Sequence, residues 1–297
     1  MHTHLNIGFI GSGVVGKSLA LALSSVGYNV TSSYSRTQSS AEALASMIPK
    51  CSVSQDAQEL VNQCELVFIT TPDDVIGNVV AKLSWSSGQG VVHCSGYGSL
   101  DLLSPAVTMG ACCGSLHPLQ TFASDCIDEV NPLQRFCGIT FGVESDGWLR
   151  DVLETMAVKL GGNVVRLNSS DKALYHAAAV MSCGHLVVLL KEASKIWEHL
   201  GFSEKECLDA LIPLAKTTLE NVSFMGLDRS MTGPIARGDS TTLQGHIKAF
   251  QTGLDDMLHL YLALSKASIP FNVTGSKDVD IQYMNDLIDR YISMPRG

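Results

Sequence analysis

LNIGFIGSGVVG, residues 5–16, is the stretch from which the fold of this chain can be predicted. The apolar run Leu5–Ile10 has the length of a buried strand, and the glycines that follow it have the spacing G-x-G-x-x-G. Residues 14–26 then continue as an apolar helical pattern rich in alanine and leucine. The order of strand, glycine turn and helix is that of a dinucleotide-binding βαβ unit.

Each glycine of this motif has its own predicted role. Gly11 permits the tight turn, Gly13 lets backbone N–H groups approach a pyrophosphate, and Gly16 lets the helix pack close to the strand. The phosphates would then lie at the positive end of the helix. A glycine-rich turn of another kind of α/β domain is the alternative interpretation. The residues expected to contact the cofactor in this segment are Gly11, Ser12, Gly13, Val14, Val15 and Gly16.

The second predicted strand, residues 28–34, indicates which dinucleotide is bound. Enzymes that use NAD commonly place Asp or Glu about 20 residues past the glycines. Here the strand is followed by Ser35 and Arg36, and no acid comes before Glu42. A guanidinium suits a phosphate because its planar fork donates two parallel charged hydrogen bonds. The sequence therefore favours NADP(H), with Ser35 and Arg36 at the 2′-phosphate; a solvated arginine at the start of a loop is the alternative.

Composition excludes several classes of protein. The 297 residues are 45% hydrophobic and 16% charged, which is typical of a globular chain with enough core for two domains. The net charge of −9 gives no bulk attraction to nucleic acid or anionic lipid. There is no basic region of a signal peptide and no uninterrupted apolar run of about 18 residues. We therefore expect no membrane span.

The number and spacing of the cysteines indicate the cellular compartment of the protein. There are nine, an odd number, and none of them forms a C-x-x-C pair. This pattern favours reduced thiols in a cytoplasmic protein. No cluster of histidine and cysteine has the spacing of metal ligands, so we expect no metal site.

The arrangement of strand-like runs and helical patterns predicts two domains. Over residues 1–168, strand-like runs alternate with helical patterns, which favours an α/β fold with a doubly wound, mostly parallel sheet. Residues 169–297 have mainly helical patterns and are expected to form an all-helical domain, beginning with one long helix over residues 172–199. The strand-like runs are residues 5–10, 28–34, 66–71, 90–94, 138–143 and 163–166.

Polar residues at the ends of these strands are candidates for the site, because an open α/β sheet binds ligands there. Thr71 and Pro72 would border the cofactor, and Ser95 would lie near the nicotinamide ring. His117 precedes a proline, which sets an extended backbone that can direct the imidazole into a cleft. The alternatives are a plain turn after the strand and a structural histidine.

Further candidates lie in the predicted helical domain. Lys172 and His176 are four residues apart and share one helix face. His176 could protonate an alkoxide because its ordinary pKa is near neutral, and Lys172 could do so only with a lowered pKa. Arg237, in the segment TGPIARGDS, could hold a carboxylate, and Asp239 could cap the following helix. A solvated lysine, a core histidine and a surface arginine are the alternatives.

Several of these segments together resemble one family. The sequences SLHPLQTF, DKALYHAAAV and TGPIARGDSTTLQGH follow the glycine motif in order. The chain resembles the Rossmann-like proteins with a DUF2520 C-terminal domain, which are related to the 6-phosphogluconate dehydrogenase and pyrroline-5-carboxylate reductase folds. Some members are PanG-type ketopantoate reductases. The resemblance implies that His117 and His176 are catalytic with Lys172, and that the substrate contacts Ser95, Thr232, Arg237, Asp239 and His246.

The resemblance also implies an activity. We expect an NADPH-dependent reductase of a small 2-oxo acid, with ketopantoate as the named substrate, acting as a homodimer through its helical domain. An imine reductase of the pyrroline-5-carboxylate reductase type and a non-catalytic NADP(H)-binding sensor are the alternatives. The sequence does not distinguish a nicotinamide from the deazaflavin F420 as hydride carrier. In the family pattern an asparagine often falls eight residues after the YHAAA histidine, where this chain has Gly184 followed by His185.

Overall fold

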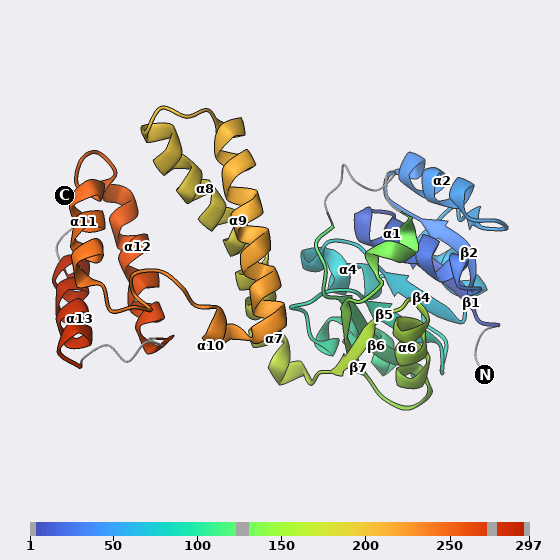
Figure 1. The fold of residues 1–297 in the computed structure, drawn as a ribbon. Coiled ribbons are helices and arrows are strands. Elements are labelled where there is room, and N and C mark those ends of the chain that lie inside the picture. The colour runs from blue at the N-terminus through green and yellow to red at the C-terminus, as the bar shows by residue number, and fades with distance from the viewer. Residues whose placement is uncertain (1–3, 123–130, 272–277, 294–297) are drawn as a thin grey trace. The chain divides into compact units, whose positions relative to one another are not determined.

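A computed structural model describes residues 4–122, 131–271 and 278–293 of the chain (Figure 1). It contains two compact units, residues 1–183 and 184–297, which are described separately. The division falls between Cys183 and Gly184, later than the boundary expected after residue 168. The reason is that helix α7 (Lys172–Ser182) is attached to the first unit by a buried side chain, described below.

The first unit is built on one eight-stranded sheet with the order β3-β2-β1-β4-β5-β6-β7-β8. All neighbouring strands are parallel except β6 and β7. The chain order reverses beside β1, which places a crevice at the carboxyl ends of β1 and β4. The strands are β1 (Asn6–Ile10), β2 (Asn29–Tyr34), β3 (Ser52–Val53), β4 (Leu66–Ile69), β5 (Gly90–His93), β6 (Cys112–Pro118), β7 (Thr140–Ser145) and β8 (Asn163–Arg166).

Helices cover both faces of this sheet, so the predicted doubly wound α/β fold is confirmed. On one face, Leu19, Leu44 and Leu153 belong to a core that includes α1, α2 and α6. On the other, Leu60 and Ile76 belong to a second core with α3, α4 and α5. The helices are α1 (Val14–Ser25), α2 (Gln38–Met47), α3 (Ala57–Gln63), α4 (Ile76–Val80), α5 (Ser104–Thr108) and α6 (Gly147–Lys159).

Strand β6 was not expected from the sequence. Its residues, CCGSLHP, carry small and polar side chains and end in proline, a pattern that resembles a loop. It forms because it lies between β5 and β7, with its backbone paired on both sides. This pairing places His117 in a strand rather than in a connecting segment.

The structure shows why two positions of the glycine motif, Gly11 and Gly16, require glycine. Gly11 has a φ of +102°, and a Cβ there would lie 2.8 Å from the backbone of Thr70. A Cβ at Gly16 would lie 2.3 Å from the carbonyl oxygen of Gly11, so only glycine lets α1 begin this close to β1. A Cβ at Gly13 would meet nothing within 4 Å. The open space at Gly13 is therefore available to a ligand.

The second unit is entirely helical over its described residues. Its core is formed by α11, α12 and α13, with Leu243, Leu262 and Ile288 fully buried. A capping box between Ser203 and Glu206 starts α9. The helices are α8 (Gly184–His199), α9 (Glu204–Met225), α10 (Leu227–Ser230), α11 (Ser240–Phe250), α12 (Asp255–Ser268) and α13 (Asp278–Ile292).

The long helix expected over residues 172–199 is interrupted at one residue. Cys183, with φ −119° and ψ −67°, divides it into α7 and α8, and α8 begins at Gly184. Across this break, residues 169–199 are long and apolar enough to cross a membrane by length and composition alone, and their most apolar window has no buried residue. The sequence analysis expected no segment long and apolar enough to span a membrane, and this stretch revises that expectation. Tyr175 and His176 lie within the same stretch and contact His117 of the sheet.

We expect the two motif glycines to respond differently to alanine. Gly16→Ala should destabilise the protein by about 1–3 kcal/mol, because the new methyl overlaps the Gly11 carbonyl. Gly13→Ala should leave the free energy of unfolding nearly unchanged, because its methyl meets open space. Urea denaturation measures both, and equal destabilisation by the two variants would contradict this description of the turn.

Candidate functional site

The amino end of α1 is prepared for an anionic group. Its N-cap is Gly13, no side chain caps the first turn, and no acidic residue lies there. The first N–H groups of the helix are therefore available to a ligand, at the positive end of the helix dipole. They border a groove of about 300 Å³ that is lined by Gly13, Val14, Val15, Ile69, Thr70, Thr71, Pro72, Asp73, Cys94, Ser95 and Phe122.

The end of β2 offers a second anion site. The Ser12 and Ser33 hydroxyls are hydrogen-bonded at 3.0 Å, which joins the glycine loop to β2. Arg36 follows the strand, is exposed, and makes no hydrogen bond or ion pair with the described residues. The N-cap of α2, Thr37, makes no side-chain capping bond either. A guanidinium and free helix N–H groups together fit the 2′-phosphate expected near Ser35 and Arg36.

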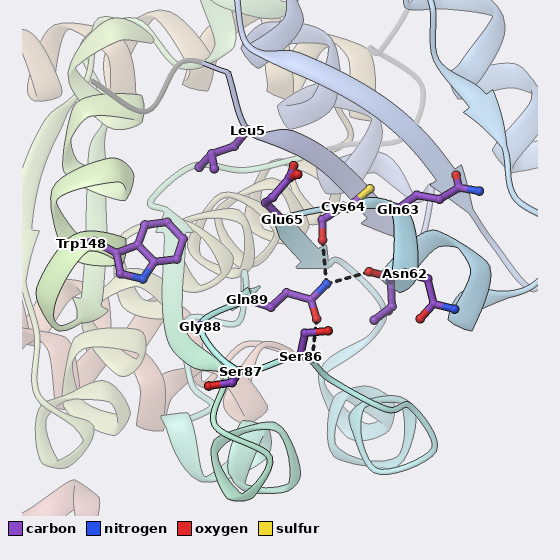
Figure 2. Close-up of a pocket in the computed structure, with 11 residues that line it drawn as sticks. Leu5, Asn62, Gln63, Cys64, Glu65, Ser86, Ser87, Gly88, Gln89 and Trp148 are labelled. Carbon is purple, nitrogen blue, oxygen red and sulfur yellow. Dashed lines mark hydrogen bonds between the residues drawn. The ribbon is translucent and has the colours of Figure 1, made fainter.

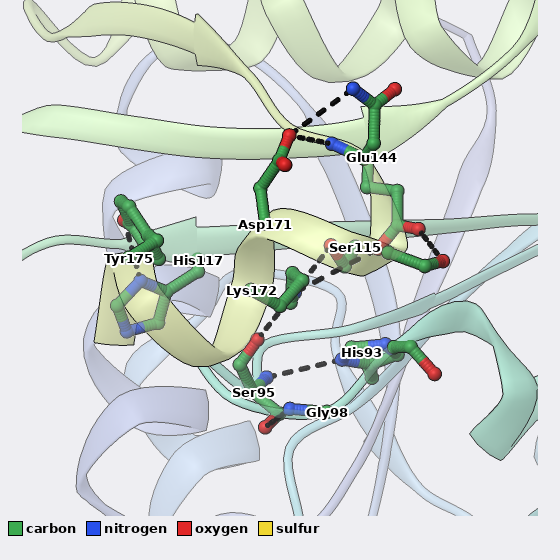
Figure 3. A network of polar contacts seen from close by, with 12 residues as sticks. His93, Ser95, Gly98, Ser115, His117, Glu144, Asp171, Lys172 and Tyr175 are labelled. Carbon is green, nitrogen blue, oxygen red and sulfur yellow. Dashed lines mark hydrogen bonds and ion pairs between the residues drawn. The ribbon is translucent and has the colours of Figure 1, made fainter. Parts of the chain in front are cut away.

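A buried ammonium group connects α7 to the sheet (Figure 3). Lys172 is 1% exposed. Its Nζ donates hydrogen bonds to the carbonyl oxygen of Ser95 at 2.9 Å and to Oγ of Ser115 at 3.0 Å. The carboxylate of Glu144, also buried, lies 4.0 Å away and accepts a hydrogen bond from the hydroxyl of Ser169.

The surroundings of Lys172 prevent its ammonium from donating a proton to a ligand. Burial lowers the pKa of its ammonium, and the negative charge of Glu144 opposes that shift. All the partners of Nζ are protein atoms, and the group is shielded from solvent. The side chain therefore holds the first turn of α7 against β5 and β6, and its protons are directed into the protein.

The next turn of α7 brings two further residues to the end of β6. The Tyr175 hydroxyl and Nδ1 of His117 are hydrogen-bonded at 2.8 Å. The rings of His117 and His176 are 6.5 Å apart, and the Tyr97 ring is 6.3 Å from that of His176. The predicted residues His117 and His176 are thus brought together, within one unit of the structure.

Gly96 permits this approach of the two imidazoles. A Cβ at Gly96 would lie 2.7 Å from Nε2 of His117 and 2.9 Å from Cδ2 of His176. The preceding residue, Ser95, donates a hydrogen bond to Asp73 at 2.5 Å and accepts one from the Gly98 amide at 2.8 Å. Because Ser95 and Asp73 also line the groove, the groove and the histidine pair share a wall.

Burial keeps two histidines near this site, His93 and His117, uncharged at neutral pH. It lowers the pKa of His93 to about 3, and the positive charge of Lys172 acts in the same direction. Burial likewise lowers the pKa of His117 to about 4, helped by Lys172 and His176. A neutral His117 can exchange a proton with the Tyr175 hydroxyl or hold a polar group by hydrogen bonding.

The remaining predicted residues belong to the second unit. Asp239 caps α11, accepting hydrogen bonds from the backbone N–H and the hydroxyl of Thr242. Nδ1 of His246 is hydrogen-bonded to the Tyr261 hydroxyl at 2.6 Å. Arg237 and Thr232 are exposed. Asp239 therefore has the capping role that the sequence offered for it.

Sequence reasoning missed four residues of the site: Asp73, Ser115, Glu144 and Tyr175. Asp73 directly follows the predicted residues Thr71 and Pro72, and Tyr175 lies between the predicted residues Lys172 and His176. No sequence signal identifies Ser115 or Glu144, because each approaches Lys172 only through the pairing of β6 with β7. Among the described residues, no group of three or more His, Cys, Asp or Glu side chains is arranged to hold a metal ion.

Two protein-family models match the chain. Residues 6–97 match the model described as NADP oxidoreductase, coenzyme F420-dependent, and residues 139–268 match the domain of unknown function DUF2520. These matches agree with the resemblance seen in the sequence and support an NADP-dependent oxidoreductase; the prediction of NADP(H) as cofactor is confirmed. A search of curated proteins found no match.

Solved structures share the fold. A protein of Bacteroides fragilis, provisionally described as an NADP oxidoreductase, has a TM-score of 0.71 at 22% identity, covering 90% of this chain and 99% of its own. A reductive aminase of Aspergillus terreus, solved with NADPH and ethyl-5-oxohexanoate, has 0.62 at 16%, covering 99% and 96%. The 1-pyrroline-5-carboxylate reductase of Streptococcus pyogenes has 0.61 at 13%, covering 98% and 100%. At these identities the likeness shows the fold alone.

We expect the buried histidines to make the first unit sensitive to acid. The unfolded chain binds a proton at each histidine near pH 6.5, whereas folded His93 binds one only near pH 3. The free energy of unfolding should therefore fall as pH drops below 6.5, by up to about 1.4 kcal/mol per pH unit for each such histidine.

Urea denaturation between pH 7 and pH 4.5 measures this slope. His93→Gln should reduce it, and the matched change His199→Gln, at an exposed position of α8, should not. An unchanged slope in a folded His93→Gln protein would contradict the assignment.

Proposed function

We propose that this chain is an NADPH-dependent reductase of a small 2-oxo acid, with 2-dehydropantoate (ketopantoate) as the best candidate. The observation that carries the proposal is the wall shared by the nucleotide groove and the pair His117 and His176, through Ser95 and its neighbour Gly96. When bound, NADPH would supply the hydride. The chain would then have to orient a carbonyl group and deliver a proton to its oxygen.

His176 is the proposed proton donor. Lys172 was the alternative, but its ammonium is buried and bonded to protein oxygens, so we assign it a positioning role. His176 is partly exposed and lies on the next turn of the helix that Lys172 fixes. A proton on its imidazole would pass to the developing alkoxide, and His117, hydrogen-bonded to Tyr175, would orient the carbonyl.

Arg237 remains the proposed ligand of the substrate carboxylate. Its guanidinium is exposed, and a planar fork of donors suits a carboxylate. An acidic protein needs a local cation of this kind to bind an anionic substrate. Thr232, Asp239 and His246 remain candidates as neighbouring substrate contacts, although Asp239 also caps α11.

An imine is the second candidate substrate. The observation that favours it is the low pKa of His117, which leaves that imidazole without a proton to donate from a charged ring at neutral pH. A protonated imine accepts a hydride without needing a proton donor, so the site would work with neutral histidines. A non-catalytic NADP(H)-binding sensor is the third interpretation.

Spectrophotometry of NADPH consumption tests these alternatives. We expect rapid oxidation of NADPH with ketopantoate, slower oxidation with other 2-oxo acids, and little with pyrroline-5-carboxylate. His176→Ala should lower kcat for the oxo acid by about 10²–10⁴-fold, the usual contribution of a general acid. It should leave NADPH affinity unchanged.

His199→Ala is the matched control, since His199 belongs to the other unit and is exposed. Oxidation with the imine alone, little affected by His176→Ala, would favour the imine reductase. Tight NADPH binding with no turnover of either class would favour the sensor.

A homodimer is the proposed assembly of a cytoplasmic protein. Large apolar side chains are exposed along α7, α8 and α9, among them Leu174 at 79% and Phe224 at 92%. Large apolar side chains exposed in this number favour a contact with another protein chain or a membrane. Lys172 and Tyr175 of α7 are bonded to the sheet, which favours a protein contact over a bilayer.

Light scattering should give about twice the chain mass of 31.8 kDa. Phe224→Asp should shift the protein toward the monomer, because a buried unpaired carboxylate at a dimer contact is strongly unfavourable. Glu220→Asp, on the same helix, is the control. A monomeric wild-type protein would exclude this assembly.

A further inference from the structure

A second cavity, of about 540 Å³, lies at the edge of the sheet opposite the nucleotide groove (Figure 2). Three of its lining residues, Leu5, Glu65 and Gln89, directly precede strands β1, β4 and β5, whereas the groove lies at the carboxyl ends of parallel strands. The two cavities share no lining residue. The second cavity is lined by Leu5, Val61, Asn62, Gln63, Cys64, Glu65, Ser86, Ser87, Gly88, Gln89 and Trp148.

One buried amide fixes the shape of this cavity. The Gln89 side chain donates hydrogen bonds to the carbonyl oxygens of Val61 and Cys64, each at 2.7 Å. It also accepts one from the Ser86 backbone N–H at 3.0 Å. The loop before β5 is thereby joined to the end of α3. The cavity is preformed, because its walls are held together by bonds within the protein.

The charge of the lining selects for a cation. Glu65 carries a carboxylate, and no lysine or arginine is among the lining residues. Oε2 of Glu65 accepts a hydrogen bond from the backbone N–H of Asn6 at 2.7 Å, which holds the carboxylate in place at the cavity. The Cys64 thiol remains neutral, because burial raises its pKa. An anion would meet the charge of Glu65 with no compensating group in the lining.

Part of the lining is apolar and aromatic, from Leu5, Val61 and Trp148, and the polar residues Asn62, Gln63, Ser86 and Ser87 complete it (Figure 2). The indole N–H of Trp148 donates to Sγ of Cys112 at 3.2 Å, which orients its ring. A carboxylate, an indole and a leucine that line one cavity suit an ammonium group attached to a hydrophobic part, because aromatic faces attract cations.

We propose that this cavity is a binding site for small organic ammonium ions that carry an apolar group. The ammonium would pair with Glu65, and the apolar part would lie against Trp148 and Leu5. Such a ligand would not compete with NADP(H), since the two cavities have separate walls. The proposal is therefore independent of the reductase activity.

Three probes that share a phenyl ring and differ in charge test the proposal: benzylammonium, benzyl alcohol and benzoate. Nuclear magnetic resonance of the ¹⁵N-labelled full chain would follow the indole N–H of Trp148 and the amides of residues 62–65 and 86–89. We expect saturable shifts with benzylammonium, weaker ones with benzyl alcohol and none with benzoate. Trp148→Phe identifies the Trp148 signal among the three tryptophans of the chain.

Glu65→Gln should weaken benzylammonium binding by about tenfold, the loss of one charge-assisted contact. Glutamine keeps an oxygen that can accept from Asn6, so the fold should persist, and unchanged NADPH affinity would verify it. Asp151→Asn, an exposed carboxylate on α6 outside the lining, is the control and should have no effect. Equal binding of all three probes, absence of binding, or unchanged affinity in Glu65→Gln would overturn the proposal.

Discussion

The site depends on the burial of one ammonium group. Lys172 enters the sheet from the first turn of α7 and is bonded to the Ser95 carbonyl and the Ser115 hydroxyl, with Glu144 as its counter-ion. Removing one partner of a buried charge pair destabilises a protein by about 3–5 kcal/mol, because the other charge is left uncompensated. The pair therefore specifies one placement of α7 on the sheet. Tyr175 and His176 follow on the next turn, and their position at the end of β6 is a consequence of that placement.

Burial, helped by the same charge, sets the protonation of two histidines near the site. A positive group in a low-dielectric interior disfavours further positive charge nearby, and it acts together with burial to lower the pKa of His93 and His117. The imidazole of His176 belongs to the same cluster but is partly exposed to solvent. The cluster therefore contains a neutral hydrogen-bonding histidine beside one that is accessible. This division of roles is what a carbonyl or imine reductase would need from two adjacent imidazoles.

The parallel sheet gives the two cavities different chemistry. At the carboxyl ends of the strands, the free N–H groups of α1 and the guanidinium of Arg36 present positive character to a phosphorylated cofactor. At the amino ends, the carboxylate of Glu65 and the indole of Trp148 present negative and aromatic character. Strands β4 and β5 run from one cavity to the other and are four residues long. The phosphorylated cofactor and the proposed ammonium ligand would therefore bind at opposite ends of these two short strands.

The sequence by itself determined the nucleotide-binding half of this protein. The glycine spacing, the strand-like runs and the absence of an acid after β2 are local features, and local sterics and apolar burial are sufficient to predict β1, α1 and the doubly wound sheet. Only the tertiary structure decided the rest. Strand β6 forms through pairing with its neighbours, and Glu144 meets Lys172 across strands distant in sequence. These features depend on contacts between remote segments, whose formation no local pattern of residues encodes.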